Sequence, residues 1–186
     1  TGNPDKFGMN ARVIHLEIDP SEVNKIVYAD VPVVGDVKRT LPMLTELVSP
    51  NDHSAWIEEF RACDKEEYRK IIEKELHPSR GPVRMGEVVH RVSEAVGENA
   101  VMVTDVGQHQ MFAARYFRYR NTRGIITSGG LGTMGFGLPA AMGAKLGCPD
   151  KQVVLFIGDG GIQMNIQELA TIMQSGIAVK IVLLNN

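Results

Sequence analysis

The sequence is poor in cysteine, has no long apolar run and carries almost no net charge. Its two cysteines, Cys63 and Cys148, are too far apart in sequence to form a metal-binding or redox motif, so both are expected to be reduced thiols. No apolar run approaches the ~20 residues needed to span a bilayer, which excludes a membrane helix. The formal net charge of -2 gives no reason to expect nucleic acid or another polyanion as a partner.

Internal repeats and low-complexity tracts are also absent. The chain starts at Thr1 without an initiator methionine, and no basic region with an apolar core follows. We therefore expect a cytoplasmic protein, and we expect this chain to be a piece of a longer one. Its 186 residues, 44% hydrophobic and 23% charged, are enough for one globular domain or two incomplete ones.

The first 50 residues predict two short strands and a helix. Branched apolar residues dominate 13–18 and 31–34, which we interpret as strands. Asp19 and Pro20 are typical of the start of a short helical stretch. Apolar residues then recur at helical spacing over 37–48.

The segment over residues 50–80 has a different composition. Residues 64–75 predict a mixed-charge helix whose charged side faces solvent at the edge of a domain. His77–Pro82 contains two prolines and a glycine and is the clearest break in the pattern. We therefore place a domain boundary there, with one domain over 1–78 and the other over 79–186.

Strands and helices alternate through the second half. The expected strands cover 100–104, 124–127, 153–157 and 179–184, and the expected helices cover 85–96, 108–116, 139–144 and 162–174. Such alternation predicts an α/β fold in which a parallel, doubly wound sheet is flanked by helices on both faces.

Polar or glycine-rich clusters follow each of these strands, at 105–109, 128–134, 158–161 and 185–186. Parallel strands bring their carboxyl ends to one edge of a sheet, where ligands bind. Asp159 and the closing asparagine are hard oxygen ligands suited to Mg²⁺. The glycines would let the backbone approach a diphosphate at the start of a helix.

Two other segments leave alternatives open. The glycine-dense run 128–137 either contacts phosphate or allows close helix packing. The basic and aromatic segment 115–123 has the composition of a nucleic-acid stacking surface, but the net charge favours a packed surface loop.

Gly158–Gly160 together with Asn185 and Asn186 resembles the thiamine diphosphate (ThDP) motif, in which Gly-Asp-Gly precedes a pair of asparagines by about 25 residues. More specifically, Val106–Met111 and Thr127–Gly135 resemble the large catalytic subunits of acetolactate synthase, also called acetohydroxyacid synthase. The resemblance covers nearly the whole chain and is weakest over 50–80.

The resemblance extends to the first half, where Ile14–Pro20 and Val33–Val37 are similar to the later part of that family's Rossmann-like middle domain. Residues 1–78 would then be the end of the middle domain plus a linker, and 79–186 the beginning of the ThDP-binding domain. Biosynthetic members also bind FAD, with Glu17 and Asp36 at the pocket, whereas the fermentative branch lacks it. Each carboxylate can equally serve as a turn or cap residue.

The resemblance implies roles for the strand-end residues. Asp159 and Asn186 would ligate Mg²⁺, and the backbone N–H groups of Gly160 and Gly161 would bind the diphosphate. The residues that would contact the cofactor from the neighbouring strand end are Val106, Gly107, Gln108 and His109, with Gln108 and His109 at the phosphates. His109 can alternatively be an ordinary capping histidine.

The aminopyrimidine ring would be held by the backbone of Gly132 and Met134. The Met134 side chain would wedge beneath the bent cofactor, although a core methionine is the plainer alternative. The glutamate that activates the cofactor is expected on an upstream domain, so none of the chain's own residues is assigned a catalytic role.

The family's reaction decarboxylates pyruvate and joins the remaining two-carbon unit to a second 2-keto acid, for branched-chain amino acid synthesis. We expect the partners to be 2-keto acids, further copies of the full-length chain in a dimer or tetramer, and a small regulatory subunit. The isolated chain is expected to be inactive. The alternatives are another ThDP-dependent decarboxylase, oxidase or carboligase, and a non-catalytic module that binds ThDP or a nucleotide.

Overall fold

The computed structural model of the chain describes residues 2–185. They form two compact units that divide between Glu58 and Glu59. The predicted domain boundary between residues 78 and 79 concerns the family's domains and stays a prediction.

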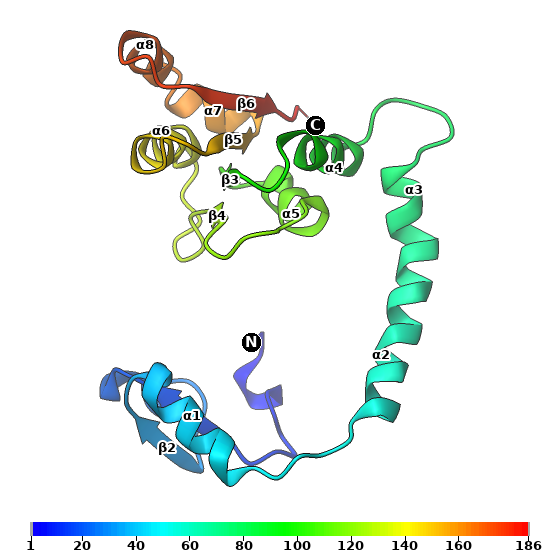
Figure 1. Cartoon of the computed structure of the whole chain (residues 1–186), viewed down its shortest axis with the longest axis vertical. Helices are drawn as coiled ribbons and strands as arrows, with labels where there is room; N and C mark the ends of the chain where they lie inside the picture. The colour runs from blue at the N-terminus through cyan, green and yellow to red at the C-terminus, as the bar shows by residue number, and fades with distance from the viewer. Residues whose placement is uncertain (1, 186) are drawn as a thin grey trace. The chain divides into compact units, whose positions relative to one another are not determined.

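The first unit is a small parallel α/β arrangement (Figure 1). Its elements are η1 (Pro4–Lys6), β1 (Ile14–Glu17), η2 (Pro20–Glu22), β2 (Val31–Val34) and α1 (Val37–Leu47). Strands β1 and β2 correspond to the two predicted strands, and they pair in parallel. The Asp19 carboxylate accepts a hydrogen bond from the Ser21 N–H, which confirms the predicted helical start.

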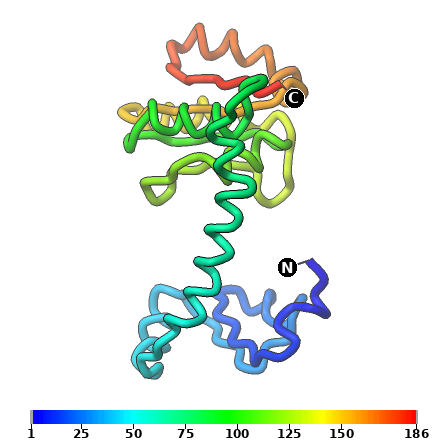
Figure 2. The backbone as a smooth tube through the Cα atoms, turned by 90° about the vertical axis from the view of Figure 1, so that its right-hand side faces the viewer, coloured from blue at the N-terminus to red at the C-terminus, as the bar shows by residue number. Residues whose placement is uncertain are grey.

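A long helical run leads into the second unit. It consists of α2 (Ser54–Glu67), a π-helical turn η3 (Tyr68–Ile72) and α3 (Glu73–Leu76), and Figure 2 traces it as one continuous coil. Ile72 and Leu76 pack against a buried cluster of the second unit. Glu75 also accepts a hydrogen bond from the Gly86 N–H at 3.0 Å. The predicted charged helix therefore has only part of its apolar stripe covered, since Tyr68 and Ile71 are exposed together with its charged side.

The second unit contains a four-stranded parallel sheet. Its remaining elements are α4 (Met85–Val96), β3 (Ala100–Thr104), α5 (Gln108–Tyr116), β4 (Ile125–Ile126), α6 (Gly137–Gly147), β5 (Gln152–Ile157), α7 (Asp159–Met164), α8 (Glu168–Gln174) and β6 (Val179–Leu183). The strand order is β4-β3-β5-β6, and every pairing is parallel. This confirms the predicted fold class.

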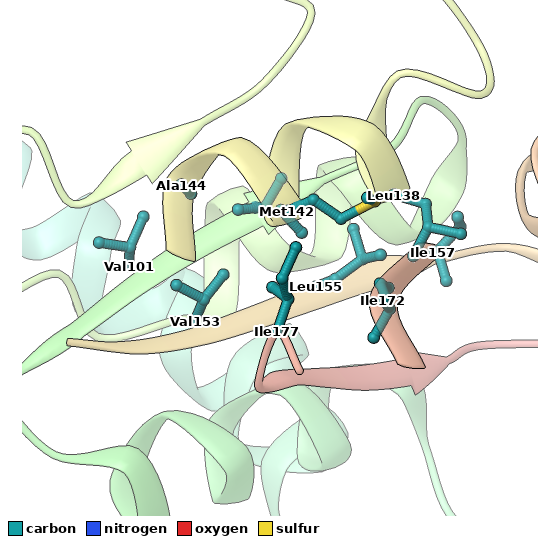
Figure 3. Close-up of a cluster of buried hydrophobic side chains, with 11 residues drawn as sticks. Val101, Leu138, Met142, Ala144, Val153, Leu155, Ile157, Ile172 and Ile177 are labelled. Atoms are coloured by element: carbon teal, nitrogen blue, oxygen red, sulfur yellow. The ribbon is translucent and has the colours of Figure 1, made fainter. Parts of the chain in front are cut away.

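The sheet is buried on both faces because its central strands are apolar at every position except Thr104 and Gln152. One face packs against α6 and α8, and Figure 3 shows Leu138 and Met142 of α6 lying over Leu155 of β5. The other face packs against α4 and α5, where the rings of Phe117 and Phe156 meet edge to face at 6.1 Å. Burying each such large apolar side chain contributes about 1.5–3 kcal/mol.

The order of the strands places a topological switch point at the carboxyl ends of β3 and β5, where doubly wound sheets have a crevice. The chain leaves β3 through α5 on one face and reaches the outer strand β4, whereas it leaves β5 through α7 and α8 toward β6. The helix α8 packs on the opposite face from α5. Neighbouring loops therefore diverge at this point, which is where ligands bind in doubly wound sheets.

One sequence prediction was wrong. The apolar period over 162–174 predicted a single helix, but α7 already begins at Asp159 and ends at Met164, and α8 starts at Glu168. Asn165 leaves the helical conformation, with φ -135° and ψ 30°. Its side-chain amide donates to the Gly135 carbonyl at 2.5 Å, a long-range contact that an uninterrupted helix would lack.

Three arginines of segment 115–123 form ion pairs, Arg115 with Glu67, Arg118 with Glu94, and Arg120 with Glu98. This neutralisation agrees with the interpretation of the segment as a packed surface loop. Within residues 2–185, no helix is long and apolar enough to cross a membrane.

Gly143 offers a simple test of the helix α6. It is exposed in the helix interior, and a Cβ added there would meet nothing within 4 Å. Because glycine in a helix interior costs about 0.5–1 kcal/mol relative to alanine, Gly143→Ala should raise the free energy of unfolding by about that amount. Urea unfolding followed by circular dichroism measures it, and a loss of stability would contradict the open surroundings of this residue.

Candidate functional site

The predicted strand-end clusters meet at one edge of the sheet. The Asp105 N–H donates to the Phe156 carbonyl at 3.1 Å, and the Leu184 N–H donates to the Ile157 carbonyl at 2.9 Å. These bonds align the residues that follow β3, β5 and β6. The predicted convergence is confirmed as far as Asn185, whereas Asn186 lies outside the described residues.

The turn after β5 exposes one carboxylate and a stretch of glycine backbone. Gly158 is buried and extended, and Asp159 is exposed at the first position of α7. Gly160 and Gly161 occupy the first turn of the same helix. A Cβ on Gly160 would lie 3.4 Å from the Met134 Cε, so the methionine reaches across this turn.

His109 lies buried against this turn. Its imidazole is 3% exposed and is enclosed by Gly107 and Gly158, where an added Cβ would approach Nδ1 to 3.0 Å. Its Nε2 makes no hydrogen bond within the described chain. Burial lowers the pKa of His109, although the Asp105 carboxylate and, more weakly, Asp159 oppose this. A neutral ring with an unused nitrogen is therefore available to a ligand.

The alternative of a capping histidine finds no support. The residue at the N-cap position of α5 is Gly107, and no side chain caps that helix end. Gln108, the first residue of α5, is exposed, and Val106 is half-buried. A Cβ on Gly132 would lie 4.0 Å from the Val106 Cγ1, so the loops after β3 and β4 are neighbours here.

The loop between β4 and α6 is shaped by glycines. Gly132 and Gly135 have φ of +62° and +83°, backbone conformations that residues with a side chain rarely adopt. The Gly132 N–H donates to the Ser128 carbonyl at 3.1 Å, which closes the loop. Met134 is 45% exposed. It is therefore not a core methionine, and its side chain is free to contact a ligand beside the β5 turn.

Asp105 is a site residue that the sequence interpretation did not assign. It is completely buried, and its Oδ2 accepts a hydrogen bond from the Gly135 N–H at 3.0 Å. Its Oδ1 has no partner within residues 2–185. A Cβ on Gly161 would overlap Oδ2. The available signal was an acid placed directly after a buried and mostly apolar strand, a position that favours neither packing nor solvation.

Glu17 and Asp36 belong to the first unit and are described there by themselves. A hollow of about 350 Å³ lies at the ends of β1 and β2, lined by Leu16, Glu17, Ile18, Gly35, Asp36 and Val37. The two carboxylates also have local partners. Glu17 accepts from the Ile18 N–H at 2.8 Å, and Asp36 caps α1 by accepting from the Lys38 N–H at 2.8 Å. This geometry is compatible with both predicted roles of the two carboxylates, lining an FAD pocket and serving as turn or cap residues.

The predicted magnesium ligands are described only in part. Asp159 presents its carboxylate at the crevice, and the second predicted ligand, Asn186, falls outside the described residues. Among the histidines, cysteines and acids of residues 2–185, no group of three or more could hold a metal ion. The donor set among the described residues is one carboxylate beside glycine backbone, which suits a cation shared with a diphosphate.

Comparison with known families agrees with this site. Residues 105–186 match the thiamine pyrophosphate enzyme C-terminal TPP-binding domain, where TPP is another name for ThDP. The match begins at Asp105 and includes all four strand-end clusters. This part of the chain is therefore similar to the C-terminal TPP-binding domain of the thiamine pyrophosphate enzymes.

The whole chain is related to acetolactate synthase large subunits. It is 46% identical over 185 residues to the large subunit from Lactococcus lactis subsp. lactis, covering 99% of this chain and 31% of that protein. It is 41% identical over 190 residues to the isozyme 3 large subunit of Escherichia coli K12, covering all of this chain and 33% of that protein. The chain thus spans about a third of the length of these relatives.

Proposed function

We propose that this chain supplies the diphosphate-binding half of a ThDP and Mg²⁺ site in an acetolactate synthase. The observation that carries the proposal is the meeting of three features at the β3–β5 crevice. They are the unpartnered Nε2 of His109, the glycine backbone of Gly158–Gly161 and the exposed side chain of Met134. A phosphate-binding nitrogen, a backbone cradle and an apolar support are what a thiazolium diphosphate requires.

The residues divide into a diphosphate side and a ring side. His109 and Gln108 would donate to phosphate oxygens, together with the N–H groups of Gly160 and Gly161. Asp159 and Asn186 would hold Mg²⁺ through side-chain oxygens. On the other side, Val106, Gly107, Gly132 and Met134 would line the place of the ring system.

The chemistry of the carbon–carbon bond would come from ThDP, which supplies a nucleophilic carbon toward 2-keto acids when it is bound. The chain's own residues would orient the cofactor. The neutral imidazole of His109 would donate to a phosphate without adding a charge, and Asp159 would help to position the cation. Met134 would support the ring system from the side of Gly160.

At the level of the whole protein, we propose condensation of pyruvate with a second 2-keto acid after decarboxylation, in branched-chain amino acid synthesis. The relatives' names support acetolactate synthase as the activity. The proposal includes a cytoplasmic homo-oligomer, a dimer or tetramer, with a small regulatory subunit. The hollow beside Glu17 and Asp36 is the proposed FAD-contacting surface.

A chimera tests the function. The matching segment of the Lactococcus large subunit would be exchanged for this chain, and the purified protein would be given pyruvate, ThDP and Mg²⁺. Acetolactate as the product supports the proposal. Acetaldehyde or acetyl phosphate instead would indicate another ThDP-dependent reaction, and no ThDP binding by a folded chimera would contradict the cofactor site.

The 186-residue chain by itself is expected to form no acetolactate from pyruvate. Its crevice is open, since Leu131 is 94% and Met134 45% exposed. Water would therefore reach any reactive group held there. A colorimetric acetoin assay on the purified chain, with the chimera as the positive control, measures this. Product formation by the chain alone at a rate near that of the chimera would refute the expectation.

A further inference from the structure

We propose that Asp105 and Asn165 are positioning residues that grip Gly135 from opposite sides and thereby hold Met134 over Gly160. The consequence for ThDP rests on the proposed function, whereas the grip itself is a property of the chain. The shared target of Asp105 and Asn165 is the residue that directly follows Met134.

The first contact comes from β3. Asp105 is wholly buried, and its Oδ2 accepts from the Gly135 N–H at 3.0 Å. A hydrogen bond from a neutral amide to a carboxylate is stronger than one to a neutral acceptor. The Asp105 backbone is itself held, because its N–H donates to the Phe156 carbonyl at 3.1 Å. Asp105 therefore ties the β4–α6 loop to the centre of the sheet.

The second contact comes from the break between α7 and α8. The Asn165 Nδ2 donates to the Gly135 carbonyl at 2.5 Å, and its Oδ1 accepts from Gln167 at 3.3 Å. A Cβ on Gly135 would lie 2.9 Å from that Nδ2 and 3.1 Å from the Met164 Cβ. The glycine thus fits closely between the sheet and the end of α7.

These two contacts fix the direction of the loop. Both the N–H and the carbonyl of Gly135 are bound, and its φ of +83° is reserved for glycine. The preceding residue, Met134, is therefore held at one end of its backbone although its side chain is half-exposed. Its Cε reaches the surface of Gly160. The position of the Met134 side chain is therefore determined by Asp105 and Asn165, which lie 30 positions before and after Gly135 in the sequence.

Methyl-¹³C NMR of methionine-labelled chain, without any cofactor, tests the grip. The Met134 signal is assigned by loss in Met134→Leu. In Asp105→Ala and in Asn165→Ala it should move toward the signal of Met173, which is 81% exposed. Asp105→Asn retains an acceptor oxygen and should keep the Met134 signal near its original position. Met102, which is fully buried, reports whether each variant is folded.

Ser93→Ala is the matched control, because it removes a buried polar group of α4 that bonds only within its own helix, to the His90 carbonyl. It should leave the Met134 signal unchanged. If Asp105→Ala does not fold, Asn165→Ala tests the proposal instead, because Asn165 is only half-buried. An unchanged Met134 signal in every folded variant of Asp105 and Asn165 would overturn the proposal.

A binding experiment connects the grip to the cofactor. In the Lactococcus chimera, Asn165→Ala should weaken ThDP binding about tenfold, which is the loss of one well-placed hydrogen bond. Binding of inorganic pyrophosphate with Mg²⁺ should not change, because the diphosphate side is untouched. Equal weakening of both ligands would contradict a specific effect on the ring side. Absence of ThDP binding in the unaltered chimera would instead refute the proposed function and leave the NMR result to decide the grip.

Discussion

Gly161→Ala should lower the free energy of unfolding of the second unit by about 3 kcal/mol, the upper end of the usual cost of overpacking. A Cβ there would overlap the Asp105 Oδ2 and would lie 2.9 Å from its Cγ and 3.3 Å from the Ile157 Cγ1. The carboxylate cannot move aside cheaply, because it is buried and holds the Gly135 N–H. Urea unfolding followed by circular dichroism measures the loss.

The neighbouring glycine provides the control for this experiment. A Cβ on Gly160 would meet only the Met134 Cε, at 3.4 Å, and this methyl group ends a flexible side chain. Gly160→Ala should therefore change the stability by less than about 1 kcal/mol. If the two alanine variants were equally stable, the buried carboxylate would not occupy the space beside Gly161.

Asp159→Ala should weaken Mg²⁺-dependent ThDP binding in the Lactococcus chimera by at least about 100-fold and abolish acetolactate formation. Loss of an outer-shell partner of a metal site already costs 10–100-fold, so loss of a direct ligand should exceed that range. Asp159 is exposed at the start of α7, so the substitution should not disturb folding. Calorimetric titration with ThDP at increasing Mg²⁺ concentration is the measurement.

The control is the same substitution at the other end of the same strand. Asp150 is an exposed aspartate that precedes β5, where its carbonyl accepts from the Asn99 side chain. Asp150→Ala keeps that backbone contact and should leave both ThDP affinity and the Mg²⁺ requirement unchanged. Full activity in Asp159→Ala would support a non-catalytic binding module in place of a synthase.

Much of the fold could be predicted because local and long-range preferences agree. The strand over 100–104 is apolar from Ala100 to Val103 and is followed by polar residues, and it forms β3 with the same limits. The helix over 85–96 likewise has an apolar stripe and is followed by Gly97, which has positive φ. In both cases the residues that determine the element lie within it or next to it.

The break at Asn165 could not be predicted for the opposite reason. Ile162, Ile166 and Leu169 keep a helical period across it, and residues 165–167 contain neither glycine nor proline. The helix ends because the Asn165 side chain bonds to Gly135, which lies 30 positions earlier. A contact of this kind is visible only after the chain has folded.

The candidate site shows the same division. Asp159, His109 and Met134 belong to motifs that resemble those of ThDP enzymes, and they meet at the predicted edge of the sheet. Asp105 was predicted only as part of the polar cluster 105–109 and received no role of its own. Its importance comes from Gly135 and Gly161, which are distant in sequence and close in space.

The close fit between Asp105 and Gly161 has an evolutionary consequence. An acid at position 105 permits only glycine at position 161, so neither position can change freely while the other stays as it is. A related protein that replaces the acid with glycine would gain room for a methyl group on α7. The two positions should therefore covary, and an alignment of the family's sequences would show this covariation.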